Sequence, residues 1–353
     1  MRTVYAPLKV FGFPGHLGPP EAGIRAPVHL RIKPINACNH GCWFCAYRSH
    51  DLSLGAEMDL KDRIPSAKME ELVEDAIAMG VRAVTFSGGG EPLLYPGIGA
   101  IVRRLAEGGV RVGVLTNGTY LRDETADALA DAATWVRVSM DGWDDESYAR
   151  LRKTKPGEFE RIRGNIAAFA ARTRRAAIGL SFIVHPENAP HLYEYCTMAK
   201  RWGVGHVKVS PCVVSDSGAT NIAYHRSTRA LVREHLSRAM QLNDANFSVV
   251  DHYHTDEASF EKPYRTCPML EFLTVIGADC SVYTCQDKAY TDAGRLGSIR
   301  DRSFRSFWFS EENRQAVAAL DPSIACRHHC VSDEKNRLLL QYRSIEPEHR
   351  FFV

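Results

Sequence analysis

Three cysteines, Cys38, Cys42 and Cys45, lie within eight positions of the segment "INACNHGCWFCAYRSH" (residues 35–50). Thiolate sulfur binds zinc and iron–sulfur clusters, so this grouping suggests metal chemistry. A structural zinc ion would need a fourth ligand, for which His40 and His50 are available, although zinc ligands usually come as two separated pairs. Three cysteines can instead hold a [4Fe–4S] cluster and leave one iron open to a substrate or cofactor. We favour this interpretation over zinc and over a chance grouping of buried thiols.

A second group of cysteines lies toward the carboxyl end. Cys267, Cys285, Cys326 and Cys330 could supply four thiolates to one [4Fe–4S] cluster with no open iron. Because the four residues form two separated groups, they also suit tetrahedral zinc. The spacing alone leaves both metals open.

The elements that must position these cysteines follow from the hydrophobic pattern. Short apolar runs predict strands at 28–35, 81–89, 110–118, 135–142, 177–185 and 206–214, and amphipathic stretches predict helices at 66–80, 96–108, 123–133, 158–173, 189–202 and 227–242. Apolar strands that are each followed by a helix imply a parallel sheet buried on both faces. Such units form either a doubly wound sheet or an incomplete barrel, and both place ligands at the carboxyl ends of the strands.

Functional residue types gather at those predicted carboxyl ends. The cysteines follow the first strand, "SGGGEP" follows the second, "TNG" the third and "SMDG" the fourth. No Gly-Lys-Ser/Thr follows the glycines, which disfavours a phosphate loop. In the first predicted helix we expect Ser66 to be the N-cap and Gly80 to end the helix.

The pattern Cys38-x3-Cys42-x2-Cys45, with Phe44 directly before the last cysteine, resembles the signature of the radical S-adenosylmethionine (radical SAM) superfamily. In that family the open iron chelates the amino and carboxylate groups of the methionine moiety. The reduced cluster then passes an electron to the sulfonium, which yields methionine and a 5′-deoxyadenosyl radical. The resemblance therefore implies two cofactors, a three-cysteine [4Fe–4S] cluster and S-adenosylmethionine.

Further motifs extend the resemblance over roughly residues 28–215. Gly89, Gly90 and Glu91 resemble the family motif that contacts the methionine amino group, where glycines permit backbone approach and a carboxylate suits an ammonium. Asn117 in "VLTNG", and Ser139 and Asp141 in "VSMDG", are similar in position to residues that recognise the ribose or the substrate, although these sequences are equally typical of turns.

The resemblance also implies the architecture. We predict an α/β fold, a partial (β/α)6 TIM-like barrel over residues 27–244, preceded by an extension (1–26) and followed by a small cysteine-rich domain (245–353). "CPMLEFLTVIGADCSVYTCQD" and "GRLGSIRDRSFRSFWFSEE" resemble the auxiliary-cluster domains called SPASM and twitch. This likeness places a second [4Fe–4S] cluster ahead of zinc at the four late cysteines. Cys280 stands where those domains usually have glycine.

Three cysteines remain outside the two groups. Cys196 lies within a predicted helix and is expected to be a small buried hydrophobe. Cys212, near the end of the sixth strand, and Cys280 are candidate catalytic residues, as hydrogen-atom donors to a substrate radical. The alternative, which we favour, is that they are ordinary core or lining thiols.

The bulk composition limits the partners. The 353 residues carry a formal net charge of +2, with basic residues spread along the chain, so neither a nucleic-acid surface nor a polybasic membrane anchor is indicated. The amino end lacks a signal-peptide layout and no segment has the length of a membrane span, so we expect a cytoplasmic protein. An external reductant such as flavodoxin or ferredoxin is then implied.

The leading functional hypothesis is a radical SAM enzyme of the oxidoreductase or epimerase type. Its substrate is expected to be a small polar molecule (a sugar, aminocyclitol or nucleotide derivative), because the short amino-terminal segment leaves little room for a peptide-recognition domain. A peptide- or protein-modifying maturase is the alternative. A non-catalytic metal-binding scaffold is a third hypothesis, and it predicts no cleavage of S-adenosylmethionine.

Overall fold

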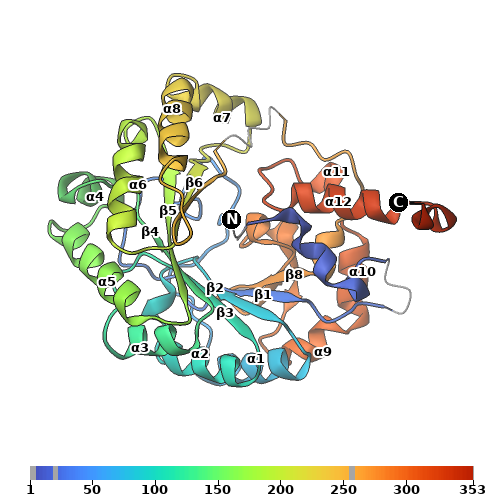
Figure 1. Ribbon diagram of the computed structural model, residues 1–353. Helices are drawn as coiled ribbons and strands as arrows, with labels where there is room; N and C mark the ends of the chain where they lie inside the picture. Colours follow the sequence, from blue (N-terminus) through green and yellow to red (C-terminus); the bar gives the residue numbers. More distant parts are fainter. Residues whose placement is uncertain (1–4, 19–22, 254–258, 353) are drawn as a thin grey trace.

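The computed structural model describes residues 5–18, 23–253 and 259–352, which share one curved ten-stranded sheet (Figure 1). The strand order is β10-β9-β8-β1-β2-β3-β4-β5-β6-β7, and every neighbouring pair from β8 to β7 is parallel. The strands are β1 (His29–Ile32), β2 (Ala83–Phe86), β3 (Arg111–Thr116), β4 (Trp135–Ser139), β5 (Ala177–Val184), β6 (His206–Pro211), β7 (Ser248–Asp251), β8 (Leu273–Ile276), β9 (Ser281–Tyr283) and β10 (Arg295–Ser298).

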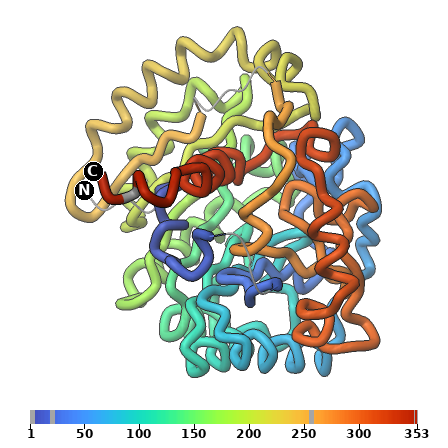
Figure 2. Tube along the Cα trace, turned by 90° about the vertical axis from the view of Figure 1, so that its right-hand side faces the viewer, coloured from blue at the N-terminus to red at the C-terminus, as the bar shows by residue number. Residues whose placement is uncertain are grey.

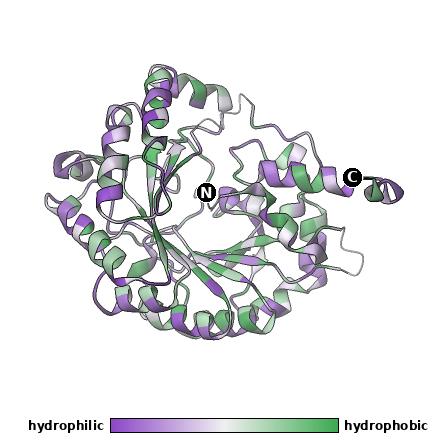
Figure 3. Ribbon diagram, viewed as in Figure 1, coloured by the Kyte–Doolittle hydropathy of each residue, from purple (hydrophilic) through white to green (hydrophobic). Residues whose placement is uncertain are grey.

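Helices cover the outer face of this sheet and leave the barrel open on one side (Figure 1). The α-helices are α1 (Ser66–Ala78), α2 (Ile98–Glu107), α3 (Asp123–Ala132), α4 (Asp145–Arg152), α5 (Glu158–Arg172), α6 (Leu192–Arg201), α7 (Gly218–His225), α8 (Arg229–Met240), α9 (Phe304–Trp308), α10 (Glu311–Ala318), α11 (Pro322–Ala325) and α12 (Asp333–Arg343). The 3-10 helices are η1 (Pro7–Gly12), η2 (Pro14–His16), η3 (Pro92–Leu94), η4 (Ala189–His191), η5 (Pro268–Glu271), η6 (Gln286–Lys288), η7 (Asp292–Gly294) and η8 (Pro347–Phe351). Apolar residues concentrate where helices meet the sheet (Figure 3). Among the described residues, no helix is both long and apolar enough to span a membrane.

The predicted α/β architecture, a partial barrel with a cysteine-rich carboxyl-terminal region, is confirmed. All six predicted strands and six predicted helices are present, and Gly80 follows α1 with a φ of +72° that glycine adopts without strain. The predicted N-cap is wrong by one residue. Pro65 takes that place and Ser66 is already helical, because the extended backbone of Pro65 (ψ 144°) breaks the helix one position earlier.

The carboxyl-terminal region continues the barrel sheet. Strand β8 pairs in parallel with β1, from His29 opposite Leu273 to Ile32 opposite Ile276, and β9 and β10 add antiparallel strands beyond it. At the opposite edge, β7 pairs in parallel with β6. Figure 2 shows the orange and red carboxyl-terminal region packed beside the blue amino-terminal segment. The expected domain limit near residue 245 therefore falls within one continuous sheet.

The two faces of the sheet differ in polarity. Alternate side chains of β1, β4 and β6 are fully buried under the helices: Leu30, Ile32, Val136, Val138, Val207 and Val209. The residues between them, Arg31, Arg137 and Lys208, lie on the inner, helix-free face and are half-buried. The inner face of this open barrel can therefore accept polar groups.

Candidate active site

The loop that follows β1 carries the first three cysteines and is fixed to the end of β2 by backbone hydrogen bonds. Gly90 N donates to Ile35 O at 3.0 Å, and Glu91 N donates to Ala37 O at 2.9 Å. Burial raises the pKa of Cys38 and of Cys42; the neighbouring Cys42 adds to the rise at Cys38, and the neighbouring Cys45 adds to the rise at Cys42. The structure therefore brings the three predicted cluster ligands together at the carboxyl rim.

Close approach of the chain explains the glycines of "SGGGEP". A Cβ built on Gly89 would lie 2.1 Å from Asn36 Oδ1, and one on Gly90 would lie 2.0 Å from Ala37 O. Both distances are far inside van der Waals contact, so a side chain at either position would push the cysteine loop away from β2. The glycines position this loop whatever else they contact.

Glu91 is buried, and its carboxylate joins the ends of two strands. Oε1 accepts from Leu93 N at 3.0 Å and from the Thr116 hydroxyl at 2.6 Å, and Oε2 accepts from Asn117 N at 2.7 Å. Burial raises the pKa of this carboxyl above its usual value, and the hydrogen bonds from Thr116, Asn117 and Leu93 oppose that rise. Glu91 thus holds the β2 and β3 ends together, in addition to the ammonium contact that the resemblance implies.

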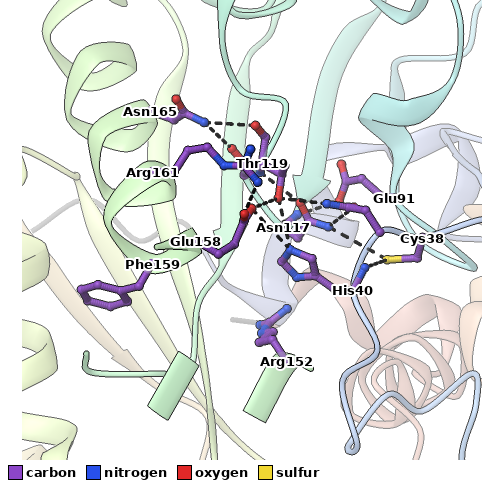
Figure 4. Close-up of polar contacts among 12 residues, drawn as sticks. Cys38, His40, Glu91, Asn117, Thr119, Arg152, Glu158, Phe159, Arg161 and Asn165 are labelled. Carbon is purple, nitrogen blue, oxygen red and sulfur yellow. Dashed lines mark hydrogen bonds and ion pairs between the residues drawn. The ribbon is translucent and has the colours of Figure 1, made fainter. Parts of the chain in front are cut away.

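A buried polar network joins the cysteine loop to the start of α5 (Figure 4). The Thr119 hydroxyl donates to Glu158 Oε1 at 2.7 Å, so His40 Nε2, 3.1 Å from the same hydroxyl, is the donor of their bond. Burial, with Arg152 and Arg161 nearby, lowers the pKa of His40 to about 3, so the ring is neutral at physiological pH. A neutral, hydrogen-bonded His40 is a structural support for the loop.

Asn117 reaches the same loop. Its Nδ2 donates to Asn39 Oδ1 at 2.8 Å and lies 4.0 Å from Cys38 Sγ, while its Oδ1 accepts from Thr119 N at 3.0 Å. The residue therefore lies beside the first thiol.

Arg152, the last residue of α4, is a rim residue that sequence reasoning missed. Its Nη2 pairs with the fully buried Asp141, its Nη1 donates to Cys42 Sγ at 3.6 Å, and its guanidinium lies 5.4 Å from the Phe44 ring centroid. Asp141 keeps the pKa of Arg152 well above its usual range despite burial. The signal in the sequence was an arginine within the helix that follows the rim residue Asp141.

The positions of the other predicted residues differ. Both carboxylate oxygens of Asp141 are occupied, one by Arg152 and the other by Ile183 N at 2.6 Å, so Asp141 supports the rim from within. Phe44 stacks near His185 with 6.1 Å between centroids. Ser139 is half-buried at the end of β4 on the inner face.

The candidate hydrogen-atom donors lie in different surroundings. Cys212 is buried after β6, its carbonyl accepts from His225, and burial raises its thiol pKa to about 12. Cys280 is buried in the main core with a left-handed φ of +62°, the conformation that glycine favours. Cys196 is fully buried in α6. All three thiols have raised pKa values and remain protonated at neutral pH.

The four late cysteines converge from three segments. Cys267 precedes η5, Cys285 follows β9, and Cys326 and Cys330 lie between α11 and α12. Burial raises the pKa of each thiol, and the charges of Cys330 and Cys267 add to the rise at Cys285. The structure therefore gathers the four predicted ligands in one neighbourhood.

Lys33 connects the two thiol groups. Its fully buried ammonium donates to Gly88 O at the first rim and to the Tyr47 hydroxyl at 2.5 Å, and Tyr47 donates to Gln286 O at 3.5 Å beside Cys285. Burial lowers the pKa of Lys33 well below its usual value. The same inner-face residue thus contacts both sites.

The donor sets fit iron–sulfur clusters. One group offers three thiols and the other four, and burial keeps most of them neutral until a metal group displaces their protons. Among the residues that the structure describes, no three or more His, Cys, Asp or Glu side chains surround a single point as ligands of one metal ion. With the four late cysteines, the carboxyl-terminal region fits an auxiliary cluster.

Comparison with known proteins identifies relatives over about half of the chain. The dTDP-4-amino-4,6-dideoxy-D-glucose ammonia-lyase of Streptomyces venezuelae is 30% identical over 177 residues, which is 48% of this chain and 35% of the lyase. The probable GTP 3′,8-cyclase of Halobacterium salinarum is 26% identical over 165 residues, 47% of this chain and 45% of the cyclase. The mycofactocin maturase MftC of Mycobacterium tuberculosis is 29% identical over 188 residues, 52% of this chain and 44% of the maturase. The matches thus span less than half of these relatives.

Solved structures share the fold over most of the chain. Streptococcus suis SuiB bound to S-adenosylmethionine aligns with a TM-score of 0.63 and 15% identity over 88% of this chain and 71% of SuiB. The anSMEcpe structure with bound AdoMet aligns with a TM-score of 0.57 and 19% identity over 82% and 83% of the two chains. Residues 32–199 match the Radical SAM superfamily. Residues 32–199 therefore form a radical SAM domain, whose cofactors are a [4Fe–4S] cluster and S-adenosylmethionine.

Proposed function

We propose that this chain is a radical SAM enzyme that abstracts a hydrogen atom from a small polar substrate, with Cys38, Cys42 and Cys45 as its three cluster ligands. The bound cluster and S-adenosylmethionine supply a reducing electron and a 5′-deoxyadenosyl radical. The observation that carries the proposal is the convergence of these three thiols at the rim beside Glu91 and Asn117.

The chain's own residues have supporting roles in this proposal. Gly89 and Gly90 keep the cysteine loop against β2, and Glu91 offers a buried carboxylate near the expected methionine ammonium. Phe44 and Ser139 line the cofactor region, and Arg152 donates toward Cys42, which stabilises sulfur in its charged form.

We also propose one auxiliary [4Fe–4S] cluster, which accepts the substrate electron or orients the substrate. Its ligands are Cys267, Cys285, Cys326 and Cys330. After anaerobic reconstitution we expect about eight iron atoms per chain, four for each cluster. About four iron atoms with bound zinc would instead assign the late cysteines to zinc. An external reductant of the flavodoxin or ferredoxin type is part of the proposal.

The test is anaerobic incubation of the reconstituted chain with S-adenosylmethionine and dithionite, followed by detection of 5′-deoxyadenosine. We expect product from the unaltered chain and none from Cys42→Ala. Cys196→Ala is the matched control, because it removes a buried thiol far from the rim in sequence, and it should retain product formation. Absence of 5′-deoxyadenosine from the unaltered, cluster-loaded chain would support a non-catalytic scaffold.

The small-molecule assignment rests on two relatives that are named for a dTDP-linked amino sugar and for GTP. The second candidate is a peptide maturase, which MftC favours as a relative of similar identity. Transfer of deuterium from a labelled candidate substrate into 5′-deoxyadenosine distinguishes the two.

The same assay with Cys212→Ala tests that residue as a hydrogen-atom donor. Unchanged turnover and unchanged product stereochemistry would exclude that role.

A further inference from the structure

Four cations converge on the inner face of the sheet below the cofactor rim. Arg31 lies on β1, Arg137 on β4 and Lys208 on β6, each between two fully buried apolar neighbours, and Lys335 comes from α12. In parallel strands that alternate in this way, the three strand residues all face away from the helices. The opposite sheet face therefore presents a concentration of positive charge.

These cations are close enough to act on one another. Arg137, Arg31 and Lys335 all disfavour the charged form of Lys208, and Arg137 does the same to Arg31. Within residues 5–18, 23–253 and 259–352, none of the four forms an ion pair with a carboxylate. Asp287 is the carboxylate that acts on Arg31 and Lys208, and Glu334 acts on Lys335, so the carboxylates near the cluster are fewer than its cationic side chains. The cluster therefore has an unbalanced charge.

Arg137 and Lys208 are held in place by aromatic residues. Arg137 Nη1 donates to the Tyr5 hydroxyl at 2.7 Å, and the Tyr5 ring centroid lies 5.6 Å from Lys208 Nζ. Tyr5 also lies 3.0 Å from His206 Nε2 through its hydroxyl. Burial and Arg137 lower the pKa of His206 to about 4, so that ring adds no charge at neutral pH. The Nε atoms of Arg31 and Arg137 are buried without a hydrogen-bond partner. Donors are thus available on a fixed scaffold.

The late thiols account for only part of this charge. Cys285 favours the charged form of Arg31, and Cys330 favours that of Lys335, so these two cations can serve a metal group at the carboxyl-terminal site. The pKa of Lys208 is lowered by burial, Arg137, Arg31 and Lys335 and raised by Asp287. None of these groups is a thiol. Arg137 and Lys208 require another anion.

We propose that Arg137 and Lys208, with Arg31 and Lys335, bind the phosphate group of a small phosphorylated substrate. This proposal rests on the proposed function, whose substrate class it narrows. Several negative charges are needed to balance the cations, and the guanidinium fork matches phosphate oxygens. Arg31 lies two strand residues, about 7 Å, below Lys33 at the rim. The phosphate of the substrate then lies one layer of inner-face side chains below the substrate carbon that faces the cofactor.

Calorimetric titration of the reconstituted full chain with inorganic pyrophosphate, under anaerobic conditions, tests this site. We expect binding that weakens steeply with added salt. Lys208→Met and Arg137→Met should each weaken it about tenfold or more, whereas Arg174→Met, the same change at an exposed arginine, should have no effect. Lys208→Arg should restore binding. If Arg137→Met fails to fold, Lys208→Met still decides the outcome.

Four results would overturn the proposal. The unaltered chain could fail to bind pyrophosphate, or Lys208→Met could bind it as tightly as the Arg174→Met control. A hexaglutamate peptide could depend on Lys208 while pyrophosphate does not, which would indicate an acidic peptide. Loss of iron from Lys208→Met would assign the cation to the metal site. Formation of 5′-deoxyadenosine without substrate is independent of these residues, so it shows separately whether the proposed function holds.

Discussion

The guanidinium of Arg152 lies between a buried carboxylate and a thiol, so one side chain sets two parts of the rim. Through Asp141 it fixes the end of β4 to β5, and through Cys42 it contacts the cysteine loop. Its carbonyl also accepts from Gly41 N at 2.9 Å. The loop geometry therefore depends on a residue more than a hundred positions away.

We expect Arg152→Met to destabilise the metal-free chain by about 3–5 kcal/mol, because the buried Asp141 carboxylate would lose its cationic partner. Urea denaturation measures this loss. The double variant Arg152→Met with Asp141→Asn should recover much of the stability, since it removes the orphaned charge. Equal losses in the single and double variants would show that the ion pair is not the cause.

Lys208 should make anion binding depend on pH. Burial and then Arg137, Arg31 and Lys335 lower its pKa to about 7, so the free chain loses this charge as the pH rises above 7. A bound anion raises that pKa, so the affinity for sulfate, whose charge is constant here, should fall by up to about tenfold per pH unit above 7.

Calorimetric titration with sulfate between about pH 6 and pH 9 measures this slope. His206 and His252, with pKa values lowered to about 4, stay neutral over the range and cannot produce it. Lys208→Arg keeps its charge and should give a flat profile. A slope that persists in Lys208→Arg would assign the titration to another group.

At the scale of elements, α12 connects the second thiol group to the rest of the fold. Asn336 Nδ2 donates to Cys267 Sγ at 3.4 Å, and its Oδ1 accepts from Met269 N at 2.9 Å, which fixes η5 against the helix. On another turn, buried Asp333 accepts from Tyr264 at 2.5 Å and pairs with Arg337 at 2.6 Å. Cys330 lies just before the start of α12. The helix therefore fixes the position of Cys267 relative to Cys330.

Asn336→Leu should reduce iron retention at the late cysteines and spare the first group. The change leaves Met269 N without its acceptor and removes the donor to Cys267, at a cost of about 1–3 kcal/mol. Iron analysis after reconstitution should fall from about eight toward about four atoms per chain. Gln341→Leu, an exposed position on the same helix, is the control and should keep its iron.

Sequence reasoning located the elements that obey local rules. The period of the strands and helices predicted the barrel units, and cysteine spacing predicted both thiol groups that the structure brings together. It misassigned the Ser66 cap, because Pro65 decides the helix start. It did not use the alternation of "HLRIK" in β1, which already carried the signal of a charged face. Arg152 and the pairing of β8 with β1 depend on contacts distant in sequence, which no local pattern encodes.

The whole molecule is organised by one sheet that runs through both cysteine sites. His29 N donates to Phe272 O and Lys33 N donates to Ile276 O, so β1 is an interior strand only while β8 is present. The first cysteine loop follows β1, and Cys267 and Cys285 flank the β8–β9 hairpin. The two groups of thiols are therefore parts of one folding unit.

A chain that ends at residue 253 should fail to fold into a soluble protein. Loss of β8 exposes the backbone of β1 as an unpaired edge and uncovers the core residues beneath it. Size-exclusion chromatography and dye binding to exposed apolar surface measure the result. A chain that ends at residue 345 removes only the exposed η8 and should remain monodisperse; a soluble, cooperatively unfolding 1–253 fragment would contradict the expectation.

Arg137 also lies 5.8 Å from the ring centroid of Trp135, whose indole fills the space over Gly113 so closely that a Cβ there would be 2.2 Å from the ring. The indole is thus immobilised beside a cation of the proposed anion site. Cation–ring contacts perturb the excited state of tryptophan, so we expect the fluorescence emission of Trp135 to change when an anion binds at the base of the barrel. Comparing the emission of the metal-free chain with that of Trp135→Phe would isolate this signal and allow candidate molecules to be screened without any turnover.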